Sequence, residues 1–287
     1  MHTEIETRYF EGDHGLRLAG DVGGDPRSPC VIMLHGGGQT RHSWGGAQRE
    51  LIRQGFHVVN LDLRGHGDSD WSPDGEYGLP LLAADLNSVI AQINSRPALV
   101  GASMGGAMAL YALGQGDPLL AQALILVDIV PNVEAAGSRK IGEFMRANRD
   151  GFANLEEASD AVAHYYPQRP RPKDPSGLMK NLRKREDGRL YWHWDPKLIS
   201  DKPRSEPPEF TEPLLEAAEN VRVPSLLVRG LQSDIVSDEG IAQLKKRLPQ
   251  LEVMDVSGAG HMVAGDKNDA FNEGVIAFLH QHMMRGR

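Results

Sequence analysis

The sequence predicts an α/β protein whose sheet is mostly parallel and carries helices on both faces. In the first half of the chain, short apolar runs alternate with stretches of helical periodicity, and the alternation resumes near the C-terminus. Nearly continuous apolar runs are typical of strands that are covered on both faces. Parallel neighbours need a crossover connection, which a helix between two strands supplies.

Six apolar runs are the expected strands, and four periodic stretches are the expected helices. In the second helix, Leu82, Leu86, Val89 and Ile93 recur at helical spacing, which predicts one apolar face. The strands are expected at 30–34, 58–63, 97–100, 123–127, 225–228 and 251–256, and the helices at 46–54, 79–93, 103–113 and about 269–280.

An unlike segment interrupts this alternation at residues 132–213. It holds 9 of the chain's 18 prolines and 8 of its 17 aromatic residues. Its proline-rich parts resist long helices, although shorter helical patterns remain within it. A linker would not be this aromatic. We therefore expect 132–213 to be a lobe inserted into a core made of 1–131 and 214–287.

Composition and charge exclude several classes of protein. The 287 residues carry a formal net charge of −8, whereas a nucleic-acid-binding protein is expected to show a basic excess. Cys30 is the one cysteine, so no internal disulfide can form. Residues 1–10 carry charges where a signal peptide needs an apolar stretch, and no apolar run could span a membrane. We expect a cytoplasmic protein with no nucleic-acid or membrane partner; the sequence leaves its oligomeric state open.

The strongest local signal is the segment Gly101-Ala102-Ser103-Met104-Gly105, between an expected strand and a helix of small residues. This G-x-S-x-G pattern predicts a sharp strand-to-helix turn that lifts the serine hydroxyl clear of the sheet. The glycines are needed because neighbouring backbone passes too close for a Cβ atom. The following helix points the positive end of its dipole at the serine. For the motif taken by itself, an ordinary glycine-rich turn is the alternative.

A second glycine run, His35-Gly36-Gly37-Gly38, follows the first of the expected parallel strands. Acyl transfer requires hydrogen-bond donors at the oxyanion that develops, and backbone amides after the nucleophile and in such a loop supply them. We therefore expect the Met104 and Gly37 amides to be the donors. A phosphate-binding loop is the alternative, but the chain has neither a G-x-x-x-x-G-K-[S/T] pattern nor a strand that leads into G-x-G-x-x-G.

A serine hydroxyl is a weak nucleophile until a base accepts its proton and a carboxylate orients that base. His261, with glycine-rich flanks, follows the expected strand 251–256, and Asp234 lies in the loop after 225–228. Both positions are at carboxyl ends of strands, where open parallel sheets place their sites. Asp128, at the end of another strand, is a second candidate for the acid. We favour Asp234 because it fits the chain order of serine, acid and histidine.

The remaining histidines do not predict a metal centre. No H-E-x-x-H or other metal-ligand spacing occurs, so we expect neither a metal nor a cofactor. His35 and His66 are expected to brace turns instead.

Taken together, these motifs resemble the α/β-hydrolase fold superfamily. The histidine–glycine run from His35, the segment Asp62-Leu-Arg-Gly-His-Gly-Asp-Ser69, the Ser103 motif and His261 preceded by Asp234 occur in the family's order and extend over nearly the whole chain. The resemblance implies an eight-stranded, mostly parallel core with a helical cap inserted after the sixth strand. The aromatic insertion falls at that point.

The resemblance also narrows the reaction. Epoxide hydrolases and haloalkane dehalogenases place aspartate at the nucleophile position, so Ser103 favours cleavage of an ester, thioester or lactone through an acyl-enzyme. Carbon–carbon bond hydrolases also use serine, but typically carry tryptophan after the catalytic histidine, where this chain has Met262. Cofactor-free haloperoxidases, which act by perhydrolysis, resemble the pattern as well. A receptor that keeps the triad but binds its ligand with little turnover is an alternative of another class.

We expect Ser103 to attack the carbonyl of a small-molecule substrate, with His261 as general base and Asp234 orienting it. Aromatic residues of the cap and two residues below it are candidates for substrate binding, although packing between cap and core is the alternative for most of them. These candidates are Tyr165, Tyr166, Tyr191, Trp192 and Trp194 of the cap, and His42 and Trp44 of the core.

Overall fold

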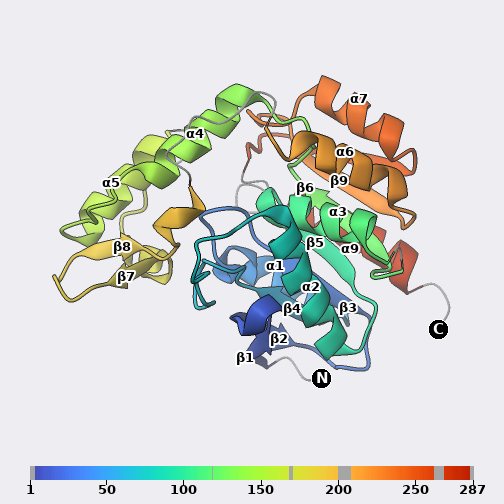
Figure 1. Ribbon diagram of the computed structural model, residues 1–287, viewed down its shortest axis with the longest axis horizontal. Helices are drawn as coiled ribbons and strands as arrows, with labels where there is room; N and C mark the ends of the chain where they lie inside the picture. The colour runs from blue at the N-terminus through green and yellow to red at the C-terminus, as the bar shows by residue number, and fades with distance from the viewer. Residues whose placement is uncertain (1–3, 118, 168–170, 200–207, 262–267, 285–287) are drawn as a thin grey trace.

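An eight-stranded sheet forms the centre of the molecule (Figure 1). The computed structural model describes residues 4–117, 119–167, 171–199, 208–261 and 268–284. The strand order is β1-β2-β4-β3-β5-β6-β9-β10; the last six run parallel, and β2 is antiparallel to both of its neighbours. The predicted mostly parallel sheet is confirmed. The strands are β1 (Ile5–Glu11), β2 (Arg17–Gly23), β3 (Cys30–Leu34), β4 (His57–Leu61), β5 (Ala98–Ala102), β6 (Ala123–Val127), β9 (Ser225–Gly230) and β10 (Leu251–Val256).

The six strands expected from the sequence are all present, and β3, β6 and β10 have the expected bounds. The two antiparallel strands at one edge, β1 and β2, were not expected. Most of β1 is exposed, and its charged residues give no apolar run. A strand with one face in water lacks the continuous apolar pattern by which buried parallel strands are found.

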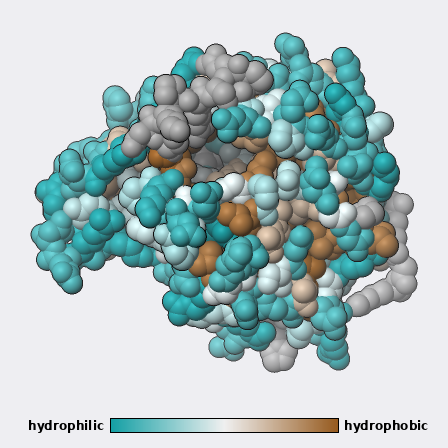
Figure 2. Space-filling model, viewed as in Figure 1, coloured by the Kyte–Doolittle hydropathy of each residue, from teal (hydrophilic) through white to brown (hydrophobic). Residues whose placement is uncertain are grey.

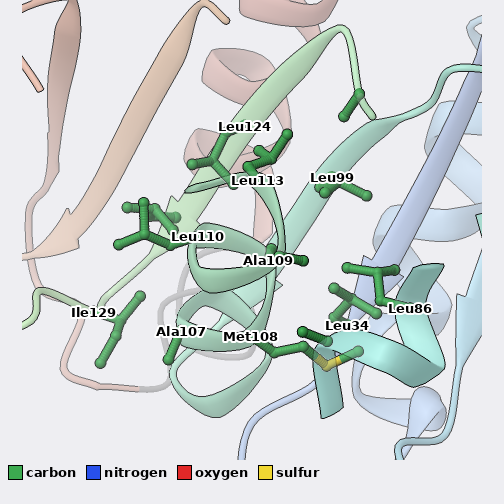
Figure 3. Packing of buried hydrophobic residues seen from close by; sticks show 14 of the residues in the cluster. Leu34, Leu86, Leu99, Ala107, Met108, Ala109, Leu110, Leu113, Leu124 and Ile129 are labelled. Atoms are coloured by element: carbon green, nitrogen blue, oxygen red, sulfur yellow. The ribbon is translucent and has the colours of Figure 1, made fainter. Parts of the chain in front are cut away.

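Helices cover both faces of the sheet and enclose two apolar cores (Figure 1). On β3, Ile32 and Leu34 pack toward one core and Val31 and Met33 toward the other, as alternation along a strand requires. The first core packs against α2, α3, α6 and α7, and Figure 3 shows α3 lying on the sheet through its small and apolar residues. The second core packs against α1 and α9. The bounds are α1 (Gly45–Arg53), α2 (Leu79–Ile93), α3 (Met104–Gln115), α6 (Thr211–Asn220), α7 (Asp238–Arg247) and α9 (Asn268–Met283).

Between β6 and α6 the chain builds a cap of two helices and a ribbon. Helices α4 (Ala135–Arg146) and α5 (Leu155–Tyr165) precede the antiparallel pair β7 (Leu182–Lys184) and β8 (Leu190–Trp192). The cap has its own apolar cluster, to which Met145, Phe152, Trp192 and Trp194 belong. It is thus not purely helical, and the exact division into 132–213 and a core stays a prediction.

Helix α3 approaches β3 very closely because glycine faces that strand. A Cβ atom on Gly105 would lie 2.5 Å from the backbone oxygen of Leu34, and one on Gly101 would lie 2.5 Å from the backbone of Gly105. No real Cβ atom tolerates such a contact with backbone, so any larger residue must push the helix off the sheet.

We expect Gly105→Ala to lower the free energy of unfolding by about 1–3 kcal/mol, because the added methyl group overpacks the interface between α3 and β3. Gly46→Ala is the matched control, since a Cβ atom at Gly46, in α1, meets nothing within 4 Å. Denaturant unfolding of both variants measures the difference. Equal stabilities would contradict the close approach.

Candidate active site

Ser103 occupies a strained turn between β5 and α3. Its backbone has φ 46° and ψ −113°, in a region that residues other than glycine rarely adopt. Its amide donates to the Val127 oxygen at 3.1 Å, which ties the turn to the end of β6. The close glycine contacts around Gly101 and Gly105 explain why the G-x-S-x-G pattern is needed here.

His261 is held by Asp128. Its Nδ1 donates to Asp128 Oδ2 at 2.8 Å, while the same carboxylate accepts from the Ser233 hydroxyl at 2.6 Å and from the Gly230 amide at 3.1 Å. Asp128 is fully buried, and these three donors satisfy it. Because Nδ1 carries the proton in this contact, Nε2 of the neutral imidazole is left as the acceptor.

The prediction that Asp234 orients His261 is wrong, because the carboxylate bonded to His261 is that of Asp128. Its side chain is 46% exposed and pairs with Lys140 of α4 at 3.5 Å. The position of Asp234 in the loop is four residues past the end of β9, and its carboxylate faces the cap. Asp128 directly follows β6 with φ 50°, and this sharp turn places its carboxylate beside His261.

The loop after β3 leaves one amide available next to the serine. The Gly36 amide donates to Gln39 Oε1 and the Gly38 amide to His66 Nε2, both at 3.1 Å. Within the described residues, the Gly37 and Met104 amides have no acceptor. Ser103, Gly37 and Met104 line one cavity together with His261, as the sequence led us to expect.

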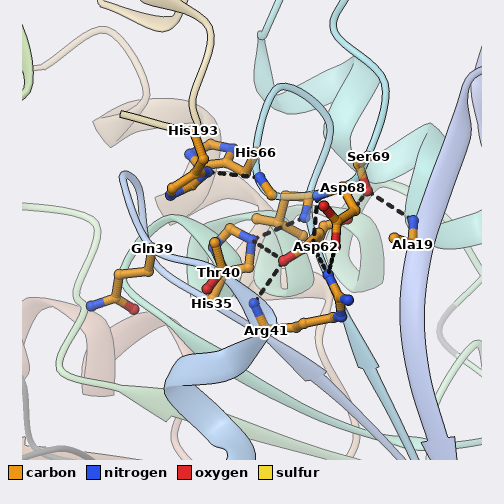
Figure 4. Close-up of polar contacts among 12 residues, drawn as sticks. Ala19, His35, Gln39, Thr40, Arg41, Asp62, His66, Asp68, Ser69 and His193 are labelled. Atoms are coloured by element: carbon orange, nitrogen blue, oxygen red, sulfur yellow. Dashed lines mark hydrogen bonds and ion pairs between the residues drawn. The ribbon is translucent and has the colours of Figure 1, made fainter. Parts of the chain in front are cut away.

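Three buried histidines, His35, His66 and His193, lie next to the loop that follows β3 (Figure 4). His35 Nδ1 donates to the Gly36 oxygen at 2.8 Å, and its Nε2 accepts from the Leu63 amide at 3.0 Å. Burial lowers the pKa of His35 to about 4 and that of His66 to about 3. The pKa of the third, His193, is lowered well below its ordinary value, again mainly by burial. All three rings are therefore neutral at physiological pH, and each carries one donor and one acceptor nitrogen.

A cavity of about 710 Å³ opens at Ser103 between core and cap. In the view of Figure 2, apolar residues are exposed near the middle of the molecule, while hydrophilic residues cover the outer end of the cap. Most of the lining is apolar and comes from both parts of the molecule. The apolar lining includes Leu79, Leu82 and Ile129 of the core, Val133 and Phe210 at the two ends of the inserted segment, and Ile141, Phe144, Met145, Val162, Leu178, Trp192, Trp194, Leu198 and Ile199 of the cap.

The cap contributes an aromatic wall to this cavity. Phe144, which the sequence did not single out, stacks on Tyr165 with ring centroids 4.3 Å apart, and Trp192 stacks on Trp194 at 5.0 Å. Tyr166 lines the cavity as well. Burial, together with the nearby Asp234 carboxylate, raises the pKa of Tyr165 to about 12, so its phenol stays neutral. Periodicity could have found Phe144, because it shares the buried side of α4 with Ile141 and Met145.

Three of the expected binding residues lie elsewhere. Trp44 is 2% exposed and packs on Phe271 in the core beneath the sheet, which corrects its assignment to substrate. His42 is exposed and does not line the cavity. The Tyr191 ring lies under the Arg185 guanidinium, and its hydroxyl donates to Asp187 at 2.7 Å, outside the cavity.

The described part of the chain offers no obvious place for a metal ion. No three His, Cys, Asp or Glu side chains among these residues gather as ligands would. In the same residues, no helix is both long and apolar enough to cross a bilayer.

Curated esterases and lipases are similar to this chain over most of its length. The sn-1-specific diacylglycerol lipase ABHD11 of Mus musculus is 28% identical over 270 residues, which cover 89% of this chain and 82% of the lipase. Esterase Rv0045c of Mycobacterium tuberculosis is 28% identical over 285 residues, or 96% of this chain and 89% of the esterase.

Solved structures are similar over the same length. A structure of the Rv0045c esterase has a TM-score of 0.76 and 26% identity, covering 96% of this chain and 92% of the other. An E-2-(acetamidomethylene)succinate hydrolase shares the fold with a TM-score of 0.81 and 22% identity, covering 96% and 99%. A family model for the alpha/beta hydrolase fold matches residues 29–267, which include every site residue named above. The chain therefore belongs to the alpha/beta hydrolase fold family.

Proposed function

We propose that the protein hydrolyses carboxylic esters of apolar acids through an acyl-enzyme formed on Ser103. The observation that carries the proposal is one cavity in which the strained serine, the His261–Asp128 pair and two unengaged backbone amides meet. Its curated relatives are named as esterases and lipases, and the chain is a carboxylic ester hydrolase like them.

In the proposed reaction, His261 Nε2 takes the proton from the Ser103 hydroxyl as the oxygen attacks the carbonyl carbon. The Gly37 and Met104 amides donate to the oxyanion of the tetrahedral intermediate. The imidazolium that forms is stabilised by Asp128, whose carboxylate stays ionised. His261 then returns the proton to the leaving alcohol, and a water molecule, activated by the same nitrogen, releases the acid.

The cavity lining supports an apolar acyl group. About 25 cal/mol is gained for each Å² of apolar surface removed from water, so a hydrocarbon or aromatic acid binds well between the aromatic wall and α2 and α3. Thioesters and lactones are cleaved by the same attack of serine on a carbonyl carbon, so the proposal includes them as substrate classes. The small-molecule nature of the substrate and the cytoplasmic location remain predictions.

The first experiment measures the steady-state turnover of p-nitrophenyl esters, from acetyl to lauroyl, by the wild type and by the Ser103→Ala variant. We expect repeated turnover that rises with acyl length until the cavity is filled. The variant should lower kcat by at least about a thousandfold, since the nucleophile is lost.

Each other outcome has a definite meaning. A Ser103→Ala variant as active as the wild type would remove Ser103 as the nucleophile. A wild type that binds the esters, seen as a thermal shift, but turns none of them over would favour the ligand-binding alternative.

Asp128 and Asp234 provide a matched pair for the acid. We expect Asp128→Asn to lower kcat by about 10²–10⁴-fold, because the amide favours the wrong tautomer of His261 and cannot stabilise the imidazolium. Asp234→Asn removes a half-exposed ion pair with Lys140 and a charge near Tyr165, neither of which involves His261, so kcat should stay within about twofold.

Turnover of both variants on the preferred ester is measured alongside their thermal unfolding. A large loss of kcat in Asp234→Asn, with Asp128→Asn near wild type, would reverse the assignment.

A further inference from the structure

We propose that His66 and the cap residue His193 are positioning residues for the oxyanion hole. Through them, the cap helps to set the orientation of the Gly37 amide opposite Ser103. The inference rests on the proposed function, because it concerns how the same site stabilises its transition state.

His66 fixes the loop that follows β3. Its Nδ1 lies 3.0 Å from the Arg64 oxygen, which can only accept, so this nitrogen carries the proton. Nε2 of His66 then carries a lone pair and accepts a hydrogen bond from the Gly38 amide at 3.1 Å. The ring is fully buried and neutral, which keeps this assignment of donor and acceptor. His66 therefore fixes the residue next to the proposed oxyanion donor, Gly37.

His193 connects this arrangement to the cap. It directly follows β8 and is 1% exposed. Its Nδ1 accepts from the Gly67 amide at 2.7 Å, and its ring centroid lies 5.8 Å from that of His66 (Figure 4). The loop that carries His66 is thus bonded to the cap one residue away from that histidine.

Further contacts fix the loop that carries His66 and lie beside its partner Gly38. Asp68 in the same loop pairs with Arg183 of β7 at 2.7 Å and with Arg41 at 2.8 Å. On its other side, Gly38 faces the cap, since a Cβ atom there would be in van der Waals contact with the Met145 side chain of α4, at 3.4 Å. Gly38 has φ 72° and so depends on its surroundings to keep this conformation.

The consequence concerns catalysis more than folding. The Gly37 N–H shares its peptide plane with the Gly36 oxygen, which His35 holds, whereas the Gly38 N–H belongs to the next plane. Freeing the Gly38 amide therefore removes the restraint on the other side of Gly37 and lets the backbone torsion angles of Gly37 change. Oxyanion donors act only when they are preorganised toward the position that the oxyanion will take. A small rotation should therefore weaken transition-state binding and leave ground-state binding nearly unchanged.

Two variants of His66 separate its two nitrogens. The amide of His66→Asn reaches the position of Nδ1 and can still donate to Arg64, but nothing replaces the acceptor for Gly38. The oxygen of His66→Gln reaches the position of Nε2 and can still accept from Gly38, but the donor is lost. We expect kcat to fall by about 10–100-fold in His66→Asn, with KM within about threefold, and to fall at least several-fold less in His66→Gln.

A transition-state analogue gives the decisive measurement. The Ser103 oxygen adds to the carbonyl of a trifluoromethyl ketone that bears the preferred acyl chain. The resulting hemiketal places an oxyanion at the Gly37 and Met104 amides. In His66→Asn its affinity should fall by the same factor as kcat/KM, whereas the affinity for the product acid stays within about threefold. If both His66 variants lose stability but keep kcat and analogue affinity, the residue is only structural and the inference is overturned.

The cap contact is tested separately with His193→Asn and His193→Leu. Asparagine can keep an acceptor for the Gly67 amide, whereas leucine of similar size cannot. We expect His193→Leu to lose about 3–10-fold in kcat and in analogue affinity, and His193→Asn to lose less. Equal values in the two would overturn the role of the cap, and this pair decides the question if His66→Asn does not fold.

Failure of the inference is distinguishable from failure of the proposed function. A wild type whose turnover survives Ser103→Ala overturns the function itself. Turnover that depends on Ser103 but is indifferent to both His66 and His193 overturns only the positioning role.

Discussion

The contact on which the site depends is the close crossing of α3 over β3 and β5 at Gly101 and Gly105. It forces Ser103 into a conformation with positive φ, which costs on the order of 1–3 kcal/mol and persists only because the packing around it is extensive. The strained turn points the hydroxyl away from the sheet and presents the Met104 amide at the start of a helix. Its bond to Val127 also fixes the turn against the strand that ends just before Asp128.

Asp128 shows how burial and function are combined at that strand end. A carboxylate without solvent exposure is costly unless donors surround it. Here the Gly230 amide at the end of β9, the Ser233 hydroxyl in the loop after β9 and His261 after β10 supply them. The carboxylate that these donors hold in place accepts from Nδ1 of His261 and so fixes the tautomer in which Nε2 is the acceptor.

Local patterns in the sequence predicted the backbone well and the directions of side chains less well. Glycine spacing identified Ser103, because steric contact at Gly101 and Gly105 leaves few residues that fit there, and the run of glycines identified the loop at Gly37. Asp128 and Asp234 both follow strands, and only the positive φ of Asp128, a tertiary feature, turns one carboxylate toward His261. Trp44 was expected below the cap as a candidate for substrate binding, but its ring is buried in the second core, against α9.

The cap is part of the catalytic arrangement as well as its cover, and three consecutive residues show why. Trp192 and Trp194 stack on each other and line the cavity, while His193 between them bonds the core loop at Gly67. His193 directly follows β8, and its ring lies edge-to-face against that of Trp194, with centroids 5.3 Å apart. The wall of the cavity and the contact with the core loop at Gly67 are therefore built by three consecutive residues. Because the His193 ring packs on that of Trp194, the proposed positioning role of His193 connects the lining of the cavity to the oxyanion loop through one short segment.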